Sequence, residues 1–307
     1  MKHRLLLLIA VPLAVMTASA QEVAERVDPL LHTVWGQDAP FNLHCPAKAD
    51  GQGVMQHCRV GCVACAMAQV MRFHKYPAVG IGEGQNMFNT ALKANFGETW
   101  YDWEHMPESY FRGYTDEEAE AVATLMFHCG VAVNMIYGLK SSSTFTAFAN
   151  NMTTALSRYF GYDETTLRSL NRSKYTKDEW LQIIREELSA GRPIIYSGNS
   201  DSMGGHTWVV DGYDEQGRVH MNWGWLGAAD DYYDIDLNIL GLDFNQKQSM
   251  VIGIQKPAAA SVRIPEAADC IPASADQVFD LQGRPVRRAS LRPGIYLHNG
   301  RKIIKTR

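Results

Sequence analysis

The chain has 307 residues, of which 46% are hydrophobic and 20% are charged, and this composition excludes a disordered or collagen-like protein. The formal net charge is −4, so the chain lacks the basic excess that a phosphate backbone attracts, and we expect no nucleic-acid partner. No acidic residue follows Asp280, whereas eight basic residues do. The charge pattern therefore predicts an acidic globular body with a basic C-terminal tail.

The first twenty residues have the pattern of a secretory signal peptide. Lys2 and Arg4 precede an apolar run over residues 5–16, and small residues at 18–20 form a cleavage site before Gln21. The run is shorter than the ~20 residues of a membrane-spanning helix, and no later segment approaches that length without charges. We therefore expect residues 1–20 to be removed, and the mature protein to be secreted, periplasmic or at the cell surface, with no integral membrane segment.

Helical patterns dominate the first half of the body. Apolar residues recur at helical spacing from Val63 to His74 and predict a helix that Tyr76-Pro77 ends. A second helix is predicted from Thr115 to Cys129, with a capping box at its start and Gly130 at its end.

Strand patterns take over in the second half. A third helix is predicted from the capping box of Thr176 and Glu179 to Gly191. Three β-rich runs follow, at residues 193–197, 206–213 and 218–225. Helices followed by antiparallel strands predict an α+β fold for the body, which we place at residues 21–256.

A small C-terminal unit is predicted beyond the body. Residues 257–275 are rich in Pro and Ala and are typical of a linker. Residues 276–307 carry short strand signals, and Asn299-Gly300 is a strong hairpin turn. Since a unit of under ~40 residues is marginally stable alone, we expect this β segment to serve sorting or attachment.

Cys62 stands at the start of the first predicted helix. A thiol at a helix N-terminus is near the positive end of the helix dipole and near unpaired N–H groups, and both favour the thiolate. Gly61 before it lets a substrate approach the backbone closely. We therefore expect Cys62 to be a nucleophile.

His206 is the expected partner of Cys62. It follows Gly204-Gly205 at the start of a predicted strand and lies 144 residues after Cys62, within the ~130–150 residues typical of papain-type Cys and His. A third group should orient the imidazole, and Asn222 and Trp223 are both candidates. Neighbouring side chains on a strand point to opposite faces, so only one of them faces His206, and spacing does not choose between them.

Acyl transfer creates an oxyanion, and Gln37, with the backbone N–H of Cys62, is its expected hydrogen-bond donor.

A zinc site is the alternative interpretation of the cysteine-rich region from residue 45 to 65. Its ligands would be Cys45, His57, Cys58, Cys62 and Cys65. Structural zinc needs ligands held in turns, whereas the last two cysteines lie on a helix, so we expect no metal and no cofactor.

Three segments together resemble the streptopain family of secreted bacterial papain-like cysteine peptidases: Gly61 to Pro77, Gly204 to Gly212, and Asn222 to Trp225. The likeness runs from about residue 28 to 256. It implies a papain-like fold of two subdomains, helical and β-sheet, in a cysteine endopeptidase that acts on protein or peptide substrates through a thiolate-imidazolium pair.

The resemblance also implies roles for individual residues. Cys62 is then the nucleophile, His206 the general acid/base, and Gln37 the oxyanion donor, and Trp223 rather than Asn222 faces the histidine. An apolar residue is expected at the P2 position of the substrate. The residues expected to border the substrate cleft are Trp225, Asn222, Gly205, Gly204 and Ser141, together with a mobile loop over residues 197–205.

The chain departs from this family in two places. Cys65 replaces a small residue, and we expect it, like Cys129, to pack in the core. Only about ten residues separate the signal peptide from the body, which leaves no room for the long inhibitory propeptide of the family. We therefore expect a separate inhibitor protein, or export itself, to restrain activity.

The tail and the fold leave two further readings open. The tail resembles the C-terminal sorting segments of secreted proteins in bacteria of the Bacteroidetes type, and a small β-unit without a sorting role is the alternative. A Cys-His acyltransferase or amidase on the same fold, and a catalytically inactive relative that acts as an adhesin or binding module, are the alternatives to the peptidase.

Overall fold

The computed structural model describes residues 23–144, 150–239 and 241–258, together with four short strands between residues 278 and 305. The chain divides into two compact units, one up to Pro257 and one from Ala258. The expected signal peptide and most of the expected linker lie outside the described residues, as does Cys270.

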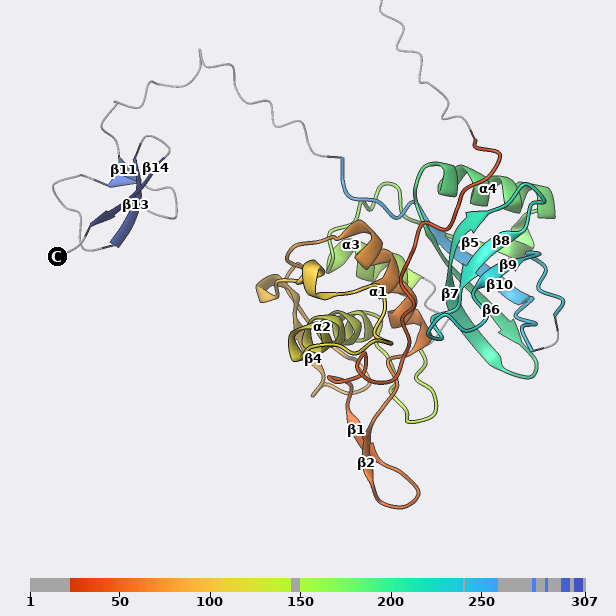
Figure 1. The fold of residues 1–307 in the computed structure, drawn as a ribbon, viewed down its shortest axis with the longest axis horizontal. Coiled ribbons are helices and arrows are strands. Elements are labelled where there is room, and N and C mark those ends of the chain that lie inside the picture. Colours follow the sequence, from red (N-terminus) through yellow and green to blue (C-terminus); the bar gives the residue numbers. More distant parts are fainter. Residues whose placement is uncertain are drawn as a thin grey trace, which may run out of the picture. The chain divides into compact units, whose positions relative to one another are not determined.

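The first half of the larger unit is mainly helical. Its elements are β1 (Ala47–Ala49), β2 (Met55–His57), α1 (Cys62–His74), β3 (Glu83–Gln85), β4 (Lys93–Asn95), η1 (Phe96–Glu98), η2 (Trp103–His105), α2 (Asp116–Ala132) and α3 (Asn150–Arg158). The strands form two small hairpins, β1 with β2 and β3 with β4. Helix α1 is buried along almost its whole length, because it packs on α2 on one side and on the sheet of the second half on the other (Figure 1).

The second half is a six-stranded sheet covered by one helix. Its elements are β5 (Arg168–Asn171), η4 (Arg172–Lys174), α4 (Lys177–Ser189), β6 (Ile194–Ser200), β7 (Gly204–Tyr213), β8 (Val219–Asn222), β9 (Asp231–Tyr233) and β10 (Gln246–Ile252). The strand order is β5-β10-β6-β7-β8-β9, and every neighbouring pair is antiparallel. The predicted α+β class is therefore confirmed.

All three predicted helices are present, with differences at their ends. Helix α1 starts one residue before the predicted Val63, and α2 and α4 both begin with the predicted capping boxes. The prediction that Gly130 ends α2 is wrong, because the helix continues to Ala132. A Cβ at Gly130 would lie 2.1 Å from Oη of Tyr137, so this glycine serves close packing and not a helix cap.

The predicted loop over residues 197–205 is also wrong. Strand β6 continues to Ser200 and β7 begins at Gly204, with these two residues paired, so that only residues 201–203 connect the strands. A Cβ at Gly198 would lie 2.1 Å from the backbone oxygen of Phe244. Glycine here marks the close approach of another backbone to a strand, a feature that looks like a loop in sequence.

The smaller unit contains a four-stranded antiparallel sheet. Its strands are β11 (Val278–Phe279), β12 (Pro285–Val286), β13 (Gly294–His298) and β14 (Arg301–Lys305), in the order β12-β11-β13-β14. The pairing of β13 with β14 sets His298 opposite Arg301, whereas the turn predicted at Asn299-Gly300 lies outside the described residues. Across the described part of the chain, no helix has the length and apolar character that crossing a membrane requires.

Candidate active site

Cys62 is the first residue of α1, at the helix end where backbone N–H groups lack partners within the helix. Gly61 before it has a φ of 95°, a conformation that favours glycine. A Cβ on Gly61 would lie 2.7 Å from Sδ of Met135 and 3.2 Å from Cβ of Ser142. Glycine therefore allows the turn before the thiol to pack against the segment from residue 135 to 142.

The thiol of Cys62 reaches across to strand β7. It accepts hydrogen bonds from the backbone N–H and from the hydroxyl of Thr207, and Oγ of Ser197 lies 2.9 Å from Oγ1 of Thr207. Thr207 directly follows His206, so Cys62 contacts the strand that carries the expected histidine. Helix α1 and strand β7 thus meet where the helical half joins the sheet, and a direct contact of Cys62 with His206 stays a prediction.

The imidazole of His206 is held by a backbone carbonyl. Its Nε2 lies 2.9 Å from the oxygen of Trp223. A carbonyl oxygen only accepts hydrogen bonds, so we infer that Nε2 carries the ring proton. Nδ1 of the neutral ring is then left as an acceptor, which is the state that a general base requires.

Four aromatic rings surround His206. The ring centroids lie 6.0 Å away for Trp208, 6.0 Å for Trp223, 4.7 Å for Trp225 and 5.3 Å for Phe244. Burial among them lowers the pKa of His206 to about 4, against which the hydrogen bond to Trp223 acts weakly. These rings therefore keep the imidazole neutral at physiological pH.

Burial favours the uncharged form of the Cys62 thiol as well. Burial raises the pKa of Cys62, although the hydrogen bonds from Thr207 and the N–H of Val63 lower it. A low dielectric disfavours both the thiolate and the imidazolium, so burial favours the uncharged form of each side chain. The expected thiolate-imidazolium pair stays a prediction.

Asn222 and Trp223 point to opposite sides of the strand end. The side chain of Asn222 donates to the oxygen of Thr33 at 2.7 Å and accepts from Nε2 of Gln69 at 3.1 Å, while Trp223 stacks on His206. Asn222 is buried and ties β8 to α1 and to the N-terminal segment. In this geometry Asn222 turns away from the imidazole, and its expected place on the substrate cleft stays a prediction.

The backbone of Gln37 contacts the segment that directly precedes Cys62. Its backbone oxygen accepts a hydrogen bond from the N–H of Val60 at 3.0 Å, two residues before Cys62. The N–H of Leu226 bonds the oxygen of Trp35 at 3.0 Å, so this segment lies between α1 and the turn after Trp225. Gln37 is partly exposed, and its role as the oxyanion donor stays a prediction.

The other expected cleft residues lie on both sides of the Cys62 turn. Ser141 is exposed, and its neighbour Ser142 is buried and donates to the oxygen of Arg59 at 2.6 Å. Gly204 and Gly205 are exposed at the first positions of β7, and Trp225 is partly exposed. The arrangement of these residues along a substrate cleft stays a prediction.

Sequence reasoning missed three residues of this site. Thr207 contacts the thiol, Phe244 packs against His206, and Asp230 accepts a hydrogen bond from the N–H of Trp223 at 2.9 Å. Burial raises the pKa of Asp230 to about 6. Thr207 follows His206 directly and was open to inference, whereas tertiary contacts bring the other two to the site.

The remaining cysteines do not assemble around Cys62. Cys45, Cys58, Cys65 and Cys129 are buried free thiols. The S–H of Cys65 points to the oxygen of Gly36 at 3.6 Å. Among the described residues, no group of three or more His, Cys, Asp or Glu side chains is placed to hold a metal ion.

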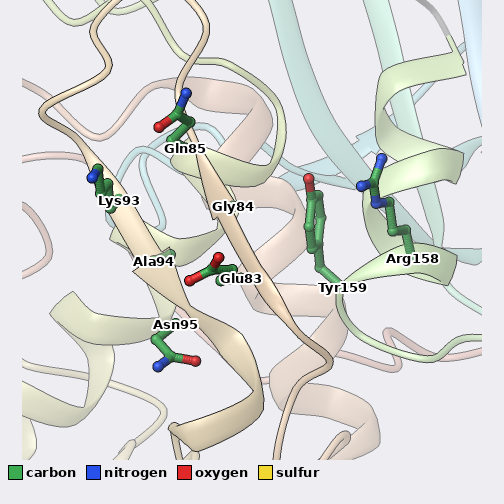
Figure 2. A pocket seen from close by; sticks show the side chains of 8 residues that line it. All are labelled: Glu83, Gly84, Gln85, Lys93, Ala94, Asn95, Arg158 and Tyr159. Carbon is green, nitrogen blue, oxygen red and sulfur yellow. The ribbon is translucent and has the colours of Figure 1, made fainter.

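A separate cavity lies away from these residues. It has a volume of about 530 Å³ and is lined by Glu83, Gly84, Gln85, Lys93, Ala94, Asn95, Arg158 and Tyr159. Figure 2 shows that these side chains come from the β3–β4 hairpin and from the end of α3. Neither Cys62 nor His206 borders it, so we do not assign it to the candidate active site.

Comparison with known proteins points to one family. Residues 35–233 match the family described as the Peptidase C10 family. The thiol protease/hemagglutinin PrtT of Porphyromonas gingivalis is 35% identical over 268 residues, which are 83% of this chain and 29% of that protein. Streptopain of Streptococcus pyogenes is 33% identical over 243 residues, which are 72% of this chain and 60% of streptopain. The chain thus spans less than two thirds of these relatives.

Solved structures agree with the sequence comparison. The active wild-type interpain A cysteine protease of Prevotella intermedia is 39% identical and matches with a TM-score of 0.68, covering 78% of this chain and 99% of that chain. A fragment of prointerpain A from the same organism is 38% identical, with a TM-score of 0.66, covering 80% and 78%. The expected papain-like, two-subdomain architecture is confirmed by these likenesses.

Proposed function

The chain belongs to the Peptidase C10 family, and from this premise we propose that it is a cysteine endopeptidase that hydrolyses protein or peptide substrates. The observation that carries the proposal is the contact of the Cys62 thiol with Thr207, the residue after His206. The hydrogen bond from Nε2 of His206 to the oxygen of Trp223 supports it, because this bond leaves Nδ1 free on the ring.

Acylation would begin with transfer of the Cys62 proton to Nδ1 of His206, which gives the thiolate-imidazolium pair. Sγ of Cys62 then forms a bond to the substrate's carbonyl carbon. The side-chain amide of Gln37 and the N–H of Cys62 donate hydrogen bonds to the oxyanion. His206 then gives its proton to the leaving amine, and an acyl-enzyme on Cys62 remains.

Deacylation would use the same histidine. Nδ1 of His206 takes a proton from a water molecule, whose oxygen attacks the acyl carbon, and the S–C bond breaks. The proton returns to the sulfur, so that the carboxylic acid leaves and the uncharged pair is restored. The aromatic rings around His206 stabilise its position through this cycle and limit the access of bulk water.

Substrate choice and location extend the same proposal. An apolar residue at P2 is the preference we propose, with Ser141, Gly204, Gly205 and Trp225 along the cleft. We further propose that the mature protein acts outside the cytoplasm and that a separate inhibitor protein, or export, restrains it.

A panel of fluorogenic peptides that differ at P2 tests this function on the mature protein. We expect cleavage, with the highest kcat/KM for apolar P2 residues, and no turnover by Cys62→Ala at unchanged thermal stability. Proteolysis by Cys62→Ala at the wild-type rate would refute the assignment of the nucleophile.

Two further measurements separate the alternatives. Rapid labelling of Cys62 by an epoxide thiol inhibitor is expected of a working Cys-His pair and not of an inactive binding relative. Added amines distinguish an acyltransferase, because amine incorporation would then exceed release of the free acid.

A further inference from the structure

A polar hollow of about 530 Å³ lies on the sheet side of the larger unit. It forms where η4 meets the start of β10, since the pairing of β10 with β5 sets Ser249 opposite Asn171. Asn171, Arg172, Lys174, Asn245, Lys247 and Gln248 line it, and its described lining residues include no carboxylate. We call it the basic pocket.

Two lysines of the basic pocket lack a counter-charge. Lys174 and Lys247 are exposed, and neither forms an ion pair within the described part of the chain. Arg172 faces Asp236 at 3.4 Å, but Asp236 is shared with Lys177 at 2.8 Å. Positive charge therefore exceeds negative charge at this place, although the chain as a whole is acidic.

The backbone at Lys247 is unusual. Its φ is 47°, a region that glycine enters easily and lysine rarely does. Lys247 lies in an irregularity of the β10–β6 pairing between Gln246 and Ser249. Bulges of this kind redirect side chains and recur next to functional sites. A lysine kept in such a conformation points to a use for its side chain.

The basic pocket adjoins the wall of the candidate active site. Nε2 of Gln248 donates to the backbone oxygen of Phe244 at 3.3 Å, and the ring of Phe244 lies 5.3 Å from that of His206. An extended peptide advances about 3.3 Å per residue. Five extended residues span roughly 16 Å, and we assign the contact with the lysines to a substrate residue within that reach of the scissile bond.

We propose that the basic pocket is an accessory subsite that binds an Asp or Glu side chain of a protein substrate held in the cleft. This inference rests on the proposed function, because it assigns the pocket to the same substrate. The side-chain amide of Asn171, which also lines the pocket, supplies an uncharged hydrogen-bonding group beside the lysines. An acidic peptide fits better than a long polyanion, since only two cations are unpaired and the surrounding body repels extended negative charge.

The kinetic test compares three peptides with the same apolar P2 residue. One is neutral, and the other two carry two Glu residues within five positions of the scissile bond, one on its amino side and one on its carboxyl side. For Lys174→Glu/Lys247→Glu, we expect kcat/KM to fall about fivefold or more for at least one acidic peptide, and to stay within about twofold for the neutral peptide. The effect should shrink at high salt.

The matched control is Lys93→Glu/Arg112→Glu. It makes the same change in net charge at two exposed residues elsewhere. We expect this control to change kcat/KM by the same factor for all three peptides. An equal loss for the neutral peptide in the pocket variant, or no selective loss at all, would overturn the proposal.

A binding measurement tests the basic pocket independently of peptidase activity. In the Cys62→Ala background, fluorescence anisotropy should show the acidic peptide binding more tightly than the neutral one, with the difference lost in the pocket variant. Equal binding of the two peptides would refute the subsite even if cleavage occurs. Failure of the wild type to cleave any peptide would refute the function while this comparison still decides the pocket. Tighter binding of a sulfated polysaccharide than of the acidic peptide, lost in the same variant, would assign the pocket to a polyanion and overturn the proposal.

Discussion

Nε2 of His206 lies 2.9 Å from the backbone oxygen of Trp223, while the indole of Trp223 stacks on the same imidazole. One residue thus orients the ring through its main chain and covers it with its side chain. The orienting acceptor is a peptide carbonyl, so a substitution at residue 223 changes the covering ring and leaves the acceptor in place.

A substitution at Asn222 tests whether this residue has a structural role or orients the imidazole of His206. In Asn222→Ala, Thr33 and Gln69 lose buried hydrogen-bond partners, so we expect the free energy of unfolding to fall by roughly 1–3 kcal/mol, with kcat/KM of the folded enzyme within about tenfold of wild type. Urea denaturation and peptide kinetics measure the two effects. A loss of kcat by three orders of magnitude without a change in stability would make Asn222 the group that orients His206.

Asp230 is expected to act on His206 through Trp223. Asp230→Ala removes the acceptor of the Trp223 N–H, so the carbonyl that holds His206 becomes less constrained. We expect kcat to fall about tenfold with little change in KM. Asp230→Asn keeps an oxygen that accepts the same hydrogen bond and should restore most of kcat. Equal losses in the two variants would show that the charge, and not the hydrogen bond, matters.

The pH dependence of kcat/KM should show an acid limb near 4. Burial lowers the pKa of His206 from 6.5 to about 4, and only the neutral ring can accept the proton of Cys62, so activity is lost as the pH falls through the lowered value. A pH profile with a neutral peptide at constant ionic strength measures this limb. A limb near 6.5 would mean that the free enzyme does not bury the imidazole as described.

The same shift has a consequence for stability. The unfolded chain binds a proton at His206 between pH 6.5 and 4 and the folded chain does not, so this residue contributes a loss of stability as the pH falls through that range, of roughly 3 kcal/mol at pH 4. The loss is absent above pH 6.5. The free energy of unfolding of the wild type should therefore fall further between pH 7 and pH 4 than that of His206→Asn, by about this amount. Identical pH dependence in both proteins would contradict the burial of His206.

Gly61 is expected to tolerate no side chain. A Cβ in this backbone conformation would approach Sδ of Met135 to 2.7 Å, so Gly61→Ala should destabilise the fold by about 1–3 kcal/mol and displace Cys62. Gly61→Ala/Met135→Ala removes the clash but keeps the unfavourable φ. We expect the double variant to recover part of kcat/KM and not all of it, and full recovery would show that the backbone conformation is not needed.

Local patterns predicted those parts of the structure that depend on neighbours in the chain. The capping boxes at Thr115 and Thr176 formed as expected, since their hydrogen bonds join residues three positions apart. Helix α1 was predictable because apolar spacing reports the buried face of a helix. Glycine was the weak signal: Gly130 resembled a helix end and Gly198 a loop, although both mark close packing.

The sequence by itself therefore determined the fold class and the helix that carries Cys62, and it predicted the pairing of Cys62 with His206 through a spacing typical of papain-type enzymes. Tertiary structure decided which face of β8 meets the imidazole, because alternation along a strand distinguishes two faces without saying what each one contacts. Phe244 and Asp230, which lie just before β10 and β9, reach the site through tertiary contacts with His206 and Trp223. The burial that shifts the pKa values of Cys62 and His206 also comes from tertiary structure, because the groups that exclude water from both side chains lie on segments far apart in the chain.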